Sequence, residues 1–165
     1  MEPTDAPVPS ITSRGEFAAA VRWAAQQAQQ RSARQLWWVD TDFADWPLSD
    51  PALLADLTRW LRQPMRRLVL LAASYEQMPR RHARFVAWRR DWVHAVEAFV
   101  PPAELAASLP CVWVDDGALS LQVIERMRWR GRCGVDARAA SRWREEIAVV
   151  LQRSEPDFPA NQLGL

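Results

Sequence analysis

The chain has 165 residues and a net charge of +1, with 49% hydrophobic and 25% charged residues, a composition typical of one soluble globular domain. No apolar run approaches the roughly 18 residues of a membrane span, and the balanced charge argues against nucleic-acid binding over the whole surface. All 21 basic residues are arginine, which excludes a phosphate-loop lysine, a Schiff-base lysine and a catalytic His-x-Lys pair.

The N-terminal part of the chain predicts a short tail, a helix and a strand. Residues 1–10 are acidic and proline-spaced, so we expect them to be disordered. They lack the positive flank and apolar stretch of a secretion signal, which favours a cytoplasmic protein. Residues 13–16, SRGE, have the spacing of a capping box, and a helix should follow to about Gln30. The run QLWWVD at residues 35–40 is apolar and rich in strand formers, which indicates a buried strand.

The middle of the chain predicts two helices around a second buried strand. Asp50 is the expected N-cap of a helix that has Pro51 at its first position and ends before Pro64. The run RRLVLLAAS, residues 66–74, is the second buried strand. Residues 79–102 carry apolar residues at helical spacing, so we expect one long helix that stops at a double proline. Its apolar stripe would consist of Phe85, Trp88, Trp92, Val96 and Phe99.

The last part of the chain predicts a hairpin, a short strand and a helix. Strands near 111–114 and 118–124 flank an Asp-Asp-Gly turn, whose Asp-Gly step suits a type I′ turn with positive φ angles. A further short strand is expected within 126–136, followed by a helix over about 137–153. Residues 154–165 should form an extended tail.

The order of elements is therefore helix, strand, helix, strand, helix, strand hairpin, helix. Alternating helices and strands predict parallel strands, and the hairpin adds antiparallel ones. The expected fold class is α/β, with a mixed sheet flanked by helices in a single domain over residues 11–153. Cys111 and Cys133 fit reduced thiols better than a disulfide framework, and neither has a histidine near it in sequence that would make it a nucleophile.

Three stretches carry a resemblance to a known family: RRLVLLAASYEQMPRRHARFVAW, CVWVDDGALSLQ and LQRSEPDF. With the element order, they resemble one half of the phospholipase D superfamily. More closely, they resemble a degenerate bacterial branch without assigned function, which occurs alone or behind an acetyltransferase domain. The resemblance covers about residues 11–165 and implies a phospholipase D-like half fold. Because such folds work by pairing two halves, it also implies a homodimer, and an exposed surplus among the ten tryptophans would suit its interface.

Active members of that superfamily carry His-x-Lys, four residues and Asp, followed by Gly-Ser-x-Asn. The histidine is the nucleophile, and the lysine and asparagine hold the phosphate. With Asp115 placed on the motif aspartate, the histidine position falls on Ser108 and the lysine position on Pro110. A shift to Asp116 is no better, and ALSLQVIE stands where Gly-Ser-x-Asn should follow. The motif is absent, so we expect no catalysis through it and no cofactor.

An arginine-rich segment supplies candidate binding residues. Nine arginines and one acidic residue lie between Arg59 and Arg90, interleaved with aromatic residues, a composition that suits phosphates and stacked bases. The alternative, which we favour, is that these arginines form solvated helix faces while the aromatic residues belong to the core. The best anion-site candidates stand at the expected start of the long helix: Arg80, Arg81, His82 and Arg84. For His82 we favour a neutral side chain that hydrogen-bonds a neighbouring loop.

A second set of candidates follows the first strand. Asp40 and Asp42 stand at the strand end where open α/β sheets bind ligands, and they would share a face if the strand continued. Their oxygens could hold a hard cation, but such residues more often cap turns or pair with arginine. We therefore expect structural pairing and no metal site.

These observations lead to three hypotheses. The first is a non-catalytic phospholipase D-like binding or regulatory module, with an anionic or phosphate ligand as one prospect. The second is a phosphate-ligand or phosphodiester enzyme with an atypical site, formed by the candidates just named. The third is a single-strand nucleic-acid-binding protein that uses the arginines of residues 59–90.

Overall fold

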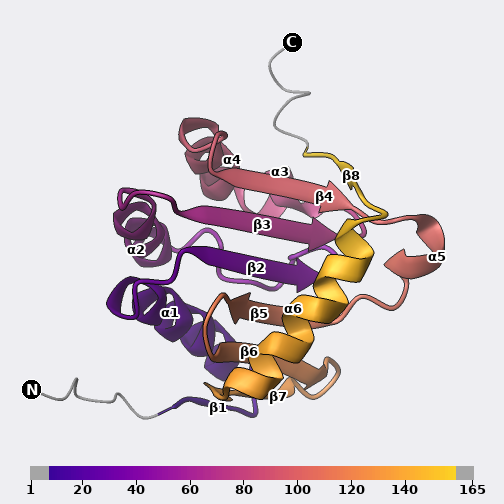
Figure 1. Cartoon of the computed structure of the whole chain (residues 1–165). Coiled ribbons are helices and arrows are strands. Elements are labelled where there is room, and N and C mark those ends of the chain that lie inside the picture. Colours follow the sequence, from indigo (N-terminus) through magenta and orange to yellow (C-terminus); the bar gives the residue numbers. More distant parts are fainter. Residues whose placement is uncertain (1–7, 159–165) are drawn as a thin grey trace, which may run out of the picture.

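The structure is a computed structural model and describes residues 8–158 of the chain. These residues form an eight-stranded mixed sheet with helices on both faces, which confirms the predicted α/β class (Figure 1). In chain order the elements are β1 (Ser10–Ile11), α1 (Arg14–Gln30), β2 (Gln35–Asp40), α2 (Pro51–Leu61), β3 (Arg67–Ala72), α3 (Gln77–Arg81), α4 (Ala83–Asp91), β4 (Val96–Val100), α5 (Ala103–Ala106), β5 (Cys111–Asp115), β6 (Leu119–Glu125), β7 (Arg130–Val135), α6 (Ala137–Leu151) and β8 (Glu155–Pro156).

The strands lie in the order β1-β7-β6-β5-β2-β3-β4-β8. Strands β2, β3 and β4 are parallel, with Gln35 opposite Arg67 and Leu68 opposite Val96. Strand β5 runs antiparallel to β2, and β6 and β7 continue as an antiparallel meander. The arrows of β2, β3 and β4 therefore point the same way in Figure 1. We call the end of the sheet where these three strands begin the amino end, and the end where they finish the carboxyl end.

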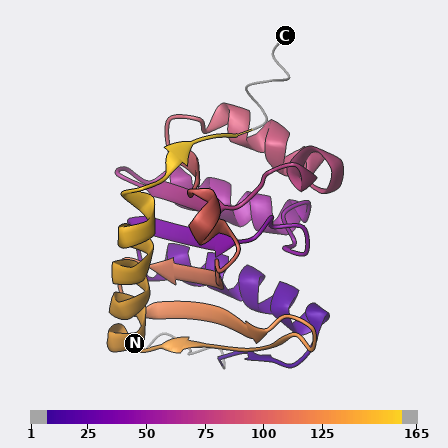
Figure 2. The same cartoon turned by 90° about the vertical axis from the view of Figure 1, so that its right-hand side faces the viewer.

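Helices α1 to α4 cover one face of the sheet and α6 covers the other (Figure 2). The larger core lies under α1 to α4 and buries Phe17, Trp38 and Trp113 completely. The smaller core lies under α6 and joins Val39 and Ile147. Two apolar layers on either side of one sheet are the arrangement that alternating helices and strands require.

The predicted starts of the first two helices are confirmed in their capping contacts. The Ser13 hydroxyl accepts the Glu16 amide at 3.1 Å, and the Glu16 carboxylate accepts the Thr12 amide at 2.8 Å. Asp50 accepts the Ala52 amide at 2.9 Å at the start of α2. Each cap satisfies an amide that the first helical turn leaves unpaired.

The prediction of one long helix over residues 79–102 is wrong. This stretch holds the end of the short helix α3, then α4, a turn and strand β4. Val96 and Ala98 face the larger core, and Phe99 packs on the side of α6. That alternation has the period of a strand, and β3 offers a free parallel edge on which it pairs. Pairing at that edge overrides the helical spacing, and Pro101 and Pro102 follow the strand instead of ending a helix.

The exposed surplus of tryptophans that would have suited a dimer interface is not found in the described residues. All ten tryptophans lie within residues 8–158, and none is exposed; five are buried and five are half-buried. Trp60 shows the usual reason, because its indole donates to the Ala33 carbonyl at 2.6 Å inside the core. The tryptophans thus supply core volume and give no support to a dimer interface.

Both ends of the chain extend outside the described part. Most of the segment predicted to be disordered, residues 1–10, lies there, although Ser10 already belongs to β1 and pairs with Arg132. The predicted tail at 154–165 contributes β8, which pairs with the end of β4, and residues 159–165 lie outside the described part. Within residues 8–158 no helix is long and apolar enough to cross a membrane.

Candidate functional site

The carboxyl end of the sheet gathers the residues that the sequence marks as a site. Asp40 is the last residue of β2, and the loop to α2 follows directly. His82 stands at the junction between α3 and α4, and it reaches this loop. The fold therefore brings Asp40 and His82, which are 42 residues apart in the sequence, together at the loop that follows β2.

Asp40 is engaged in structural contacts. Only 3% of its surface is exposed; one carboxylate oxygen accepts the Phe43 amide at 2.9 Å and the other accepts the Arg126 guanidinium. Arg126 also donates to the Leu109 carbonyl at 3.3 Å, so it links the β6–β7 loop both to the end of β2 and to the segment that precedes β5. The expected pairing of this aspartate with arginine is confirmed, and the partner comes from a segment that the sequence did not single out.

Asp42 does not share a site with Asp40. Its carboxylate accepts the Ala44 amide at 2.9 Å, which is a local turn contact two residues along the chain. The described residues contain no group of three or more histidine, cysteine, aspartate or glutamate side chains that could hold a metal ion.

His82 is buried and hydrogen-bonded to the loop that follows β2. Its Nε2 donates to the Phe43 carbonyl at 2.8 Å, and its Nδ1 lies 3.4 Å from the Ser49 hydroxyl. Burial lowers the pKa of His82 because the protonated ring would lose its hydration, and the hydrogen bond to Phe43 only partly opposes this. The expected hydrogen bond to a neighbouring loop is confirmed, and the lowered pKa favours the neutral ring that we expected.

Phe43 is the residue that this network holds. It is fully buried and has a φ of 59°, a conformation that is unfavourable for a bulky side chain. Asp40 accepts its amide and His82 donates to its carbonyl, so both backbone polar groups of the strained residue are satisfied. We call Asp40, Phe43, His82 and Arg126 the Phe43 clamp. The polar groups of the clamp bond to one another and do not face a pocket.

The arginines beside the clamp are not arranged as the sequence suggested. Arg80 and Arg81 lie in the last turn of the five-residue helix α3, where cations stabilise the helix dipole, and not at the start of a long helix. Arg81 lies 3.7 Å from Asp45, which also pairs with Arg14 at 3.0 Å. Arg80 and Arg84 are exposed, and among the described residues they make no ion pair. Arg84 does lie in the first turn of the nine-residue helix α4, which has His82 at its N-cap, so only this part of the predicted helix-mouth arrangement is present.

The Asp-Asp-Gly hairpin lies at the opposite, amino end of the sheet. The Asp115 carboxylate accepts the Gly117 and Leu119 amides at 2.8 and 3.0 Å. Burial raises its pKa, since the charged form is poorly hydrated there. No glycine in the described residues has a positive φ, so the type I′ turn is wrong, and the Asp115 side chain stabilises the turn instead. Arg144 of α6 donates to the Asp115 and Gly117 carbonyls, both at 2.8 Å.

The arginine-rich segment is divided between the two ends of the sheet. Arg80, Arg81 and Arg84 lie at the carboxyl end, whereas the remaining exposed arginines of the segment lie at the amino end. There the Arg67 amide donates to the Arg34 carbonyl at 3.0 Å, and the Leu68 amide donates to the Ala95 carbonyl at 2.9 Å. These contacts join the loops that precede β2, β3 and β4. The arginine edge comprises Arg34, Arg62, Arg66, Arg67 and Arg90.

The arginine edge has acidic side chains beside it at two points: Glu97 lies beside Arg67, and the Asp116 carboxylate accepts the Arg34 backbone amide at 3.2 Å. The nine residues from 59 to 67 contain four arginines and no acid. Arg67 pairs with Glu97, whereas Arg34, Arg62 and Arg90 are exposed and have no ion pair among the described residues. A linear motif could not reveal this group, because Arg34 enters it only through the pairing of β2 with β3.

Comparisons with known proteins identify the fold. No family model matches the chain, and no curated protein matches it either. Among solved structures, it matches TrmBL2, an archaeal chromatin protein whose structure shows a novel mode of DNA binding, with a TM-score of 0.62 and 12% sequence identity. The match covers 93% of this chain and 56% of that one, so the chain spans about half the length of its neighbour. The two share a fold.

Proposed function

We propose that the chain is a non-catalytic binding module of the phospholipase D-like half type, and that it binds nucleic acid through backbone phosphates at the arginine edge. The observation that carries the proposal is the grouping of Arg34, Arg62 and Arg90 at one end of the sheet without ion-pair partners among the described residues. Guanidinium groups match phosphate oxygens in geometry and keep their charge at any physiological pH.

The chemistry at the carboxyl end supports the non-catalytic part of this proposal. A nucleophilic histidine needs a free ring nitrogen that points at a substrate, but the Nε2–H of His82 donates to the Phe43 carbonyl, and its Nδ1 lies 3.4 Å from the Ser49 hydroxyl. The Asp40 carboxylate is buried and occupied on both oxygens. The chain has no lysine that could hold a phosphate beside them. An atypical phosphodiesterase site built on these residues gains no support from this geometry.

The structural neighbour supports the choice of ligand class. TrmBL2 is a chromatin protein whose structure shows a novel mode of DNA binding, and this property belongs to that protein. In this chain, a net charge of +1 restricts polyanion binding to a local patch, and the arginine edge is such a patch. The five half-buried tryptophans pack against the two cores and are not free to stack on bases. Contact with phosphates should therefore dominate binding.

The proposal is tested by fluorescence anisotropy with labelled single- and double-stranded DNA of about 20 nucleotides, titrated from about 25 to 200 mM salt. We expect salt-dependent binding with little sequence preference. Replacing Arg34, Arg62 and Arg90 together by glutamine should weaken binding at least about tenfold at low salt. On single strands it should also reduce the slope of log K against log salt by about 2, which corresponds to three lost phosphate contacts.

A matched variant removes the same charge from the other end of the sheet. Arg80, Arg84 and Arg128 are also exposed and unpaired among the described residues, and their triple glutamine variant should bind as wild type does. Equal losses in both variants would mean that the arginine edge is not the interface. Absence of binding at the lowest salt would overturn the proposal. The homodimer that the half fold suggests remains a proposal, and sedimentation velocity of the free chain tests it independently.

A further inference from the structure

Arg89 is a buried arginine without an acidic partner in the described part of the chain. It lies in the last turn of α4 with 7% of its surface exposed. Its guanidinium carbon is 4.2 Å from the centroid of the Phe158 ring, and its Nε has no hydrogen-bond partner. Arginine is rarely buried without a paired charge, because the desolvated cation costs free energy that a partner normally offsets. The same burial lowers the pKa of Arg89.

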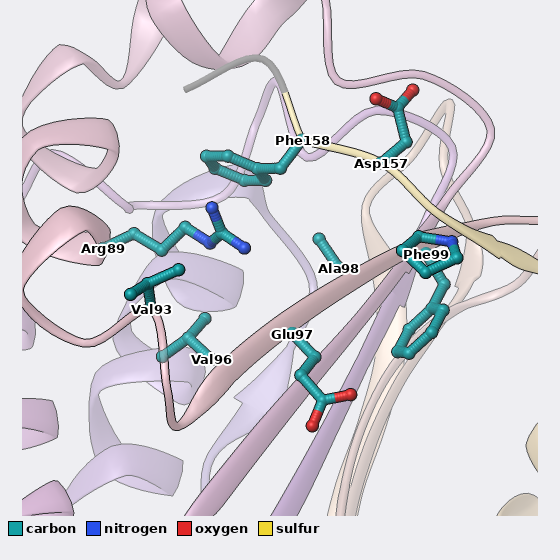
Figure 3. Close-up of a pocket in the computed structure, with 9 residues that line it drawn as sticks. Arg89, Val93, Val96, Glu97, Ala98, Phe99, Asp157 and Phe158 are labelled. Atoms are coloured by element: carbon teal, nitrogen blue, oxygen red, sulfur yellow. The ribbon is translucent and has the colours of Figure 1, made fainter. Parts of the chain in front are cut away.

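The Arg89 side chain faces a pocket at the outer edge of the sheet (Figure 3). The pocket has a volume of about 350 Å³, within the range of small-molecule sites. It exists because β8 pairs only with Phe99 and Val100, which leaves the first half of β4 without a strand on the side opposite β3. Val93 and Val96 line one side of it and Phe158 the other, so the guanidinium lies between apolar walls.

The two acidic residues at the rim do not neutralise Arg89. Glu97 pairs with Arg67, and in Figure 3 its carboxylate points away from the guanidinium. Asp157 is held by its backbone amide, which donates to the Ala98 carbonyl at 3.0 Å, and its carboxylate also points away. The pocket therefore offers one positive charge, several apolar contacts and two negative charges at its entrance.

We propose that this pocket binds a small monocarboxylate with an apolar or aromatic body, and that Arg89 is its anchor. A carboxylate presents two coplanar oxygens that match the two-donor side of a guanidinium. The apolar body would contact Val93, Val96 and Phe158, and the Phe158 ring already covers one side of the guanidinium at 4.2 Å. A phosphate dianion fits less well, because Glu97 and Asp157 would repel its second charge and the walls offer it no further donor. This inference is independent of the nucleic-acid proposal.

The chain itself is the other conceivable source of a carboxylate. Residues 159–165 continue from Phe158 and contain no aspartate or glutamate, so only a terminal carboxylate could reach Arg89 from this segment. A short Gly-Ser extension at the C-terminus would displace such a group without altering the pocket.

The test uses benzoate as the probe, with benzamide as its neutral isostere and inorganic phosphate as the competing anion. Binding to the full-length chain is measured by titration calorimetry and by the rise in melting temperature. We expect saturable benzoate binding, at least about tenfold weaker benzamide binding, and no saturable binding of phosphate. Arg89→Met should lose benzoate binding at least about tenfold, whereas Arg84→Met, at an exposed position of the same helix, should keep it.

Several outcomes would overturn the proposal. Equal affinity for benzoate and benzamide would show an apolar pocket without a charge anchor, and this comparison stands even if Arg89→Met does not fold. Tighter binding of phosphate than of benzoate would exclude a carboxylate site. Benzoate binding only by the Gly-Ser-extended chain would show that the terminal carboxylate occupies the pocket. Absence of benzoate binding by both chains would remove the site altogether.

Discussion

Replacing Asp40 by alanine tests the Phe43 clamp most directly. Asp40 is 3% exposed, and its carboxylate accepts the Phe43 amide at 2.9 Å and the Arg126 guanidinium. Alanine would leave the Phe43 amide without a partner in a fully buried residue that already has a φ of 59°. The strained loop conformation would then lose one of the two contacts that hold it.

The magnitude follows from the two lost contacts. A buried amide left unpaired costs about 1–3 kcal/mol. The Arg126 side chain is 43% exposed, so solvent screens its ion pair and the loss of that pair adds no more than about 1 kcal/mol. We therefore expect Asp40→Ala to lower the free energy of unfolding by about 2–3 kcal/mol, which for a chain of this size lowers the melting temperature by roughly 5–10 °C.

Urea unfolding followed by tryptophan fluorescence measures this loss, since several of the ten tryptophans lie in the core around Phe43. Asp40→Asn is the matched control. It keeps an oxygen that can accept the Phe43 amide, so it should lose only about 1 kcal/mol. If Asp40→Asn destabilises as much as Asp40→Ala, or if the alanine variant loses less than about 1 kcal/mol, the amide contact does not hold the loop and the clamp is misassigned.

Two further predictions concern His82 and β7. Because burial lowers the pKa of His82 in the folded state, the unfolded chain takes up a proton first as the pH falls toward about 6.5 and below. The free energy of unfolding should therefore decrease from pH 7 to pH 5, and the decrease should be smaller in His82→Gln. Urea unfolding at each pH measures both. An equal decrease in both proteins would exclude this role of His82. In Gly131→Ala the new Cβ would lie 2.2 Å from the Gln122 carbonyl oxygen of the paired strand, so we expect a loss of about 1–3 kcal/mol in thermal unfolding. Gly134→Ala meets nothing within 4 Å and should change stability by less than about 0.5 kcal/mol; similar effects at both glycines would contradict the register of β6 and β7.

The elements that the sequence predicted correctly have their cause in nearby residues. The caps at Ser13 and Asp50 act on amides two or three residues away, and both helices begin there. The buried strand at residues 35–40 has the predicted bounds, and the helix predicted over about 137–153 ends at Leu151. Such features need no information about the rest of the fold, so the sequence suffices for them.

Strand β4 could not be predicted in the same way. The segment that contains it repeats apolar residues at a spacing that fits a helix, and the alternation of Val96, Ala98 and Val100 fits a strand as well. What decides between the two is the free edge of β3, which is a property of the assembled sheet. The candidate site shows the same limit: the Asp40 pairing was expected, but its partner Arg126 lies 86 positions away.

Two arginines of the arginine edge lie at helix C-termini, where a cation stabilises the helix whether or not DNA binds. The DNA-binding experiment must therefore separate this stabilising role from a role in binding. Arg62 caps the C-terminus of α2 and Arg90 lies in the last turn of α4, where a cation stabilises the helix dipole by about 0.3–1 kcal/mol. Their replacement by glutamine should therefore cost some stability even if no nucleic acid ever binds. A dipole role predicts a small loss in urea unfolding and unchanged behaviour toward DNA, whereas the proposed interface predicts a loss of salt-dependent binding in a chain that remains folded. Arg80 lies in the last turn of α3 and Arg84 in the first turn of α4, so the control variant also changes charges at helix ends. A binding defect confined to the amino end therefore cannot come from helix-dipole charges alone.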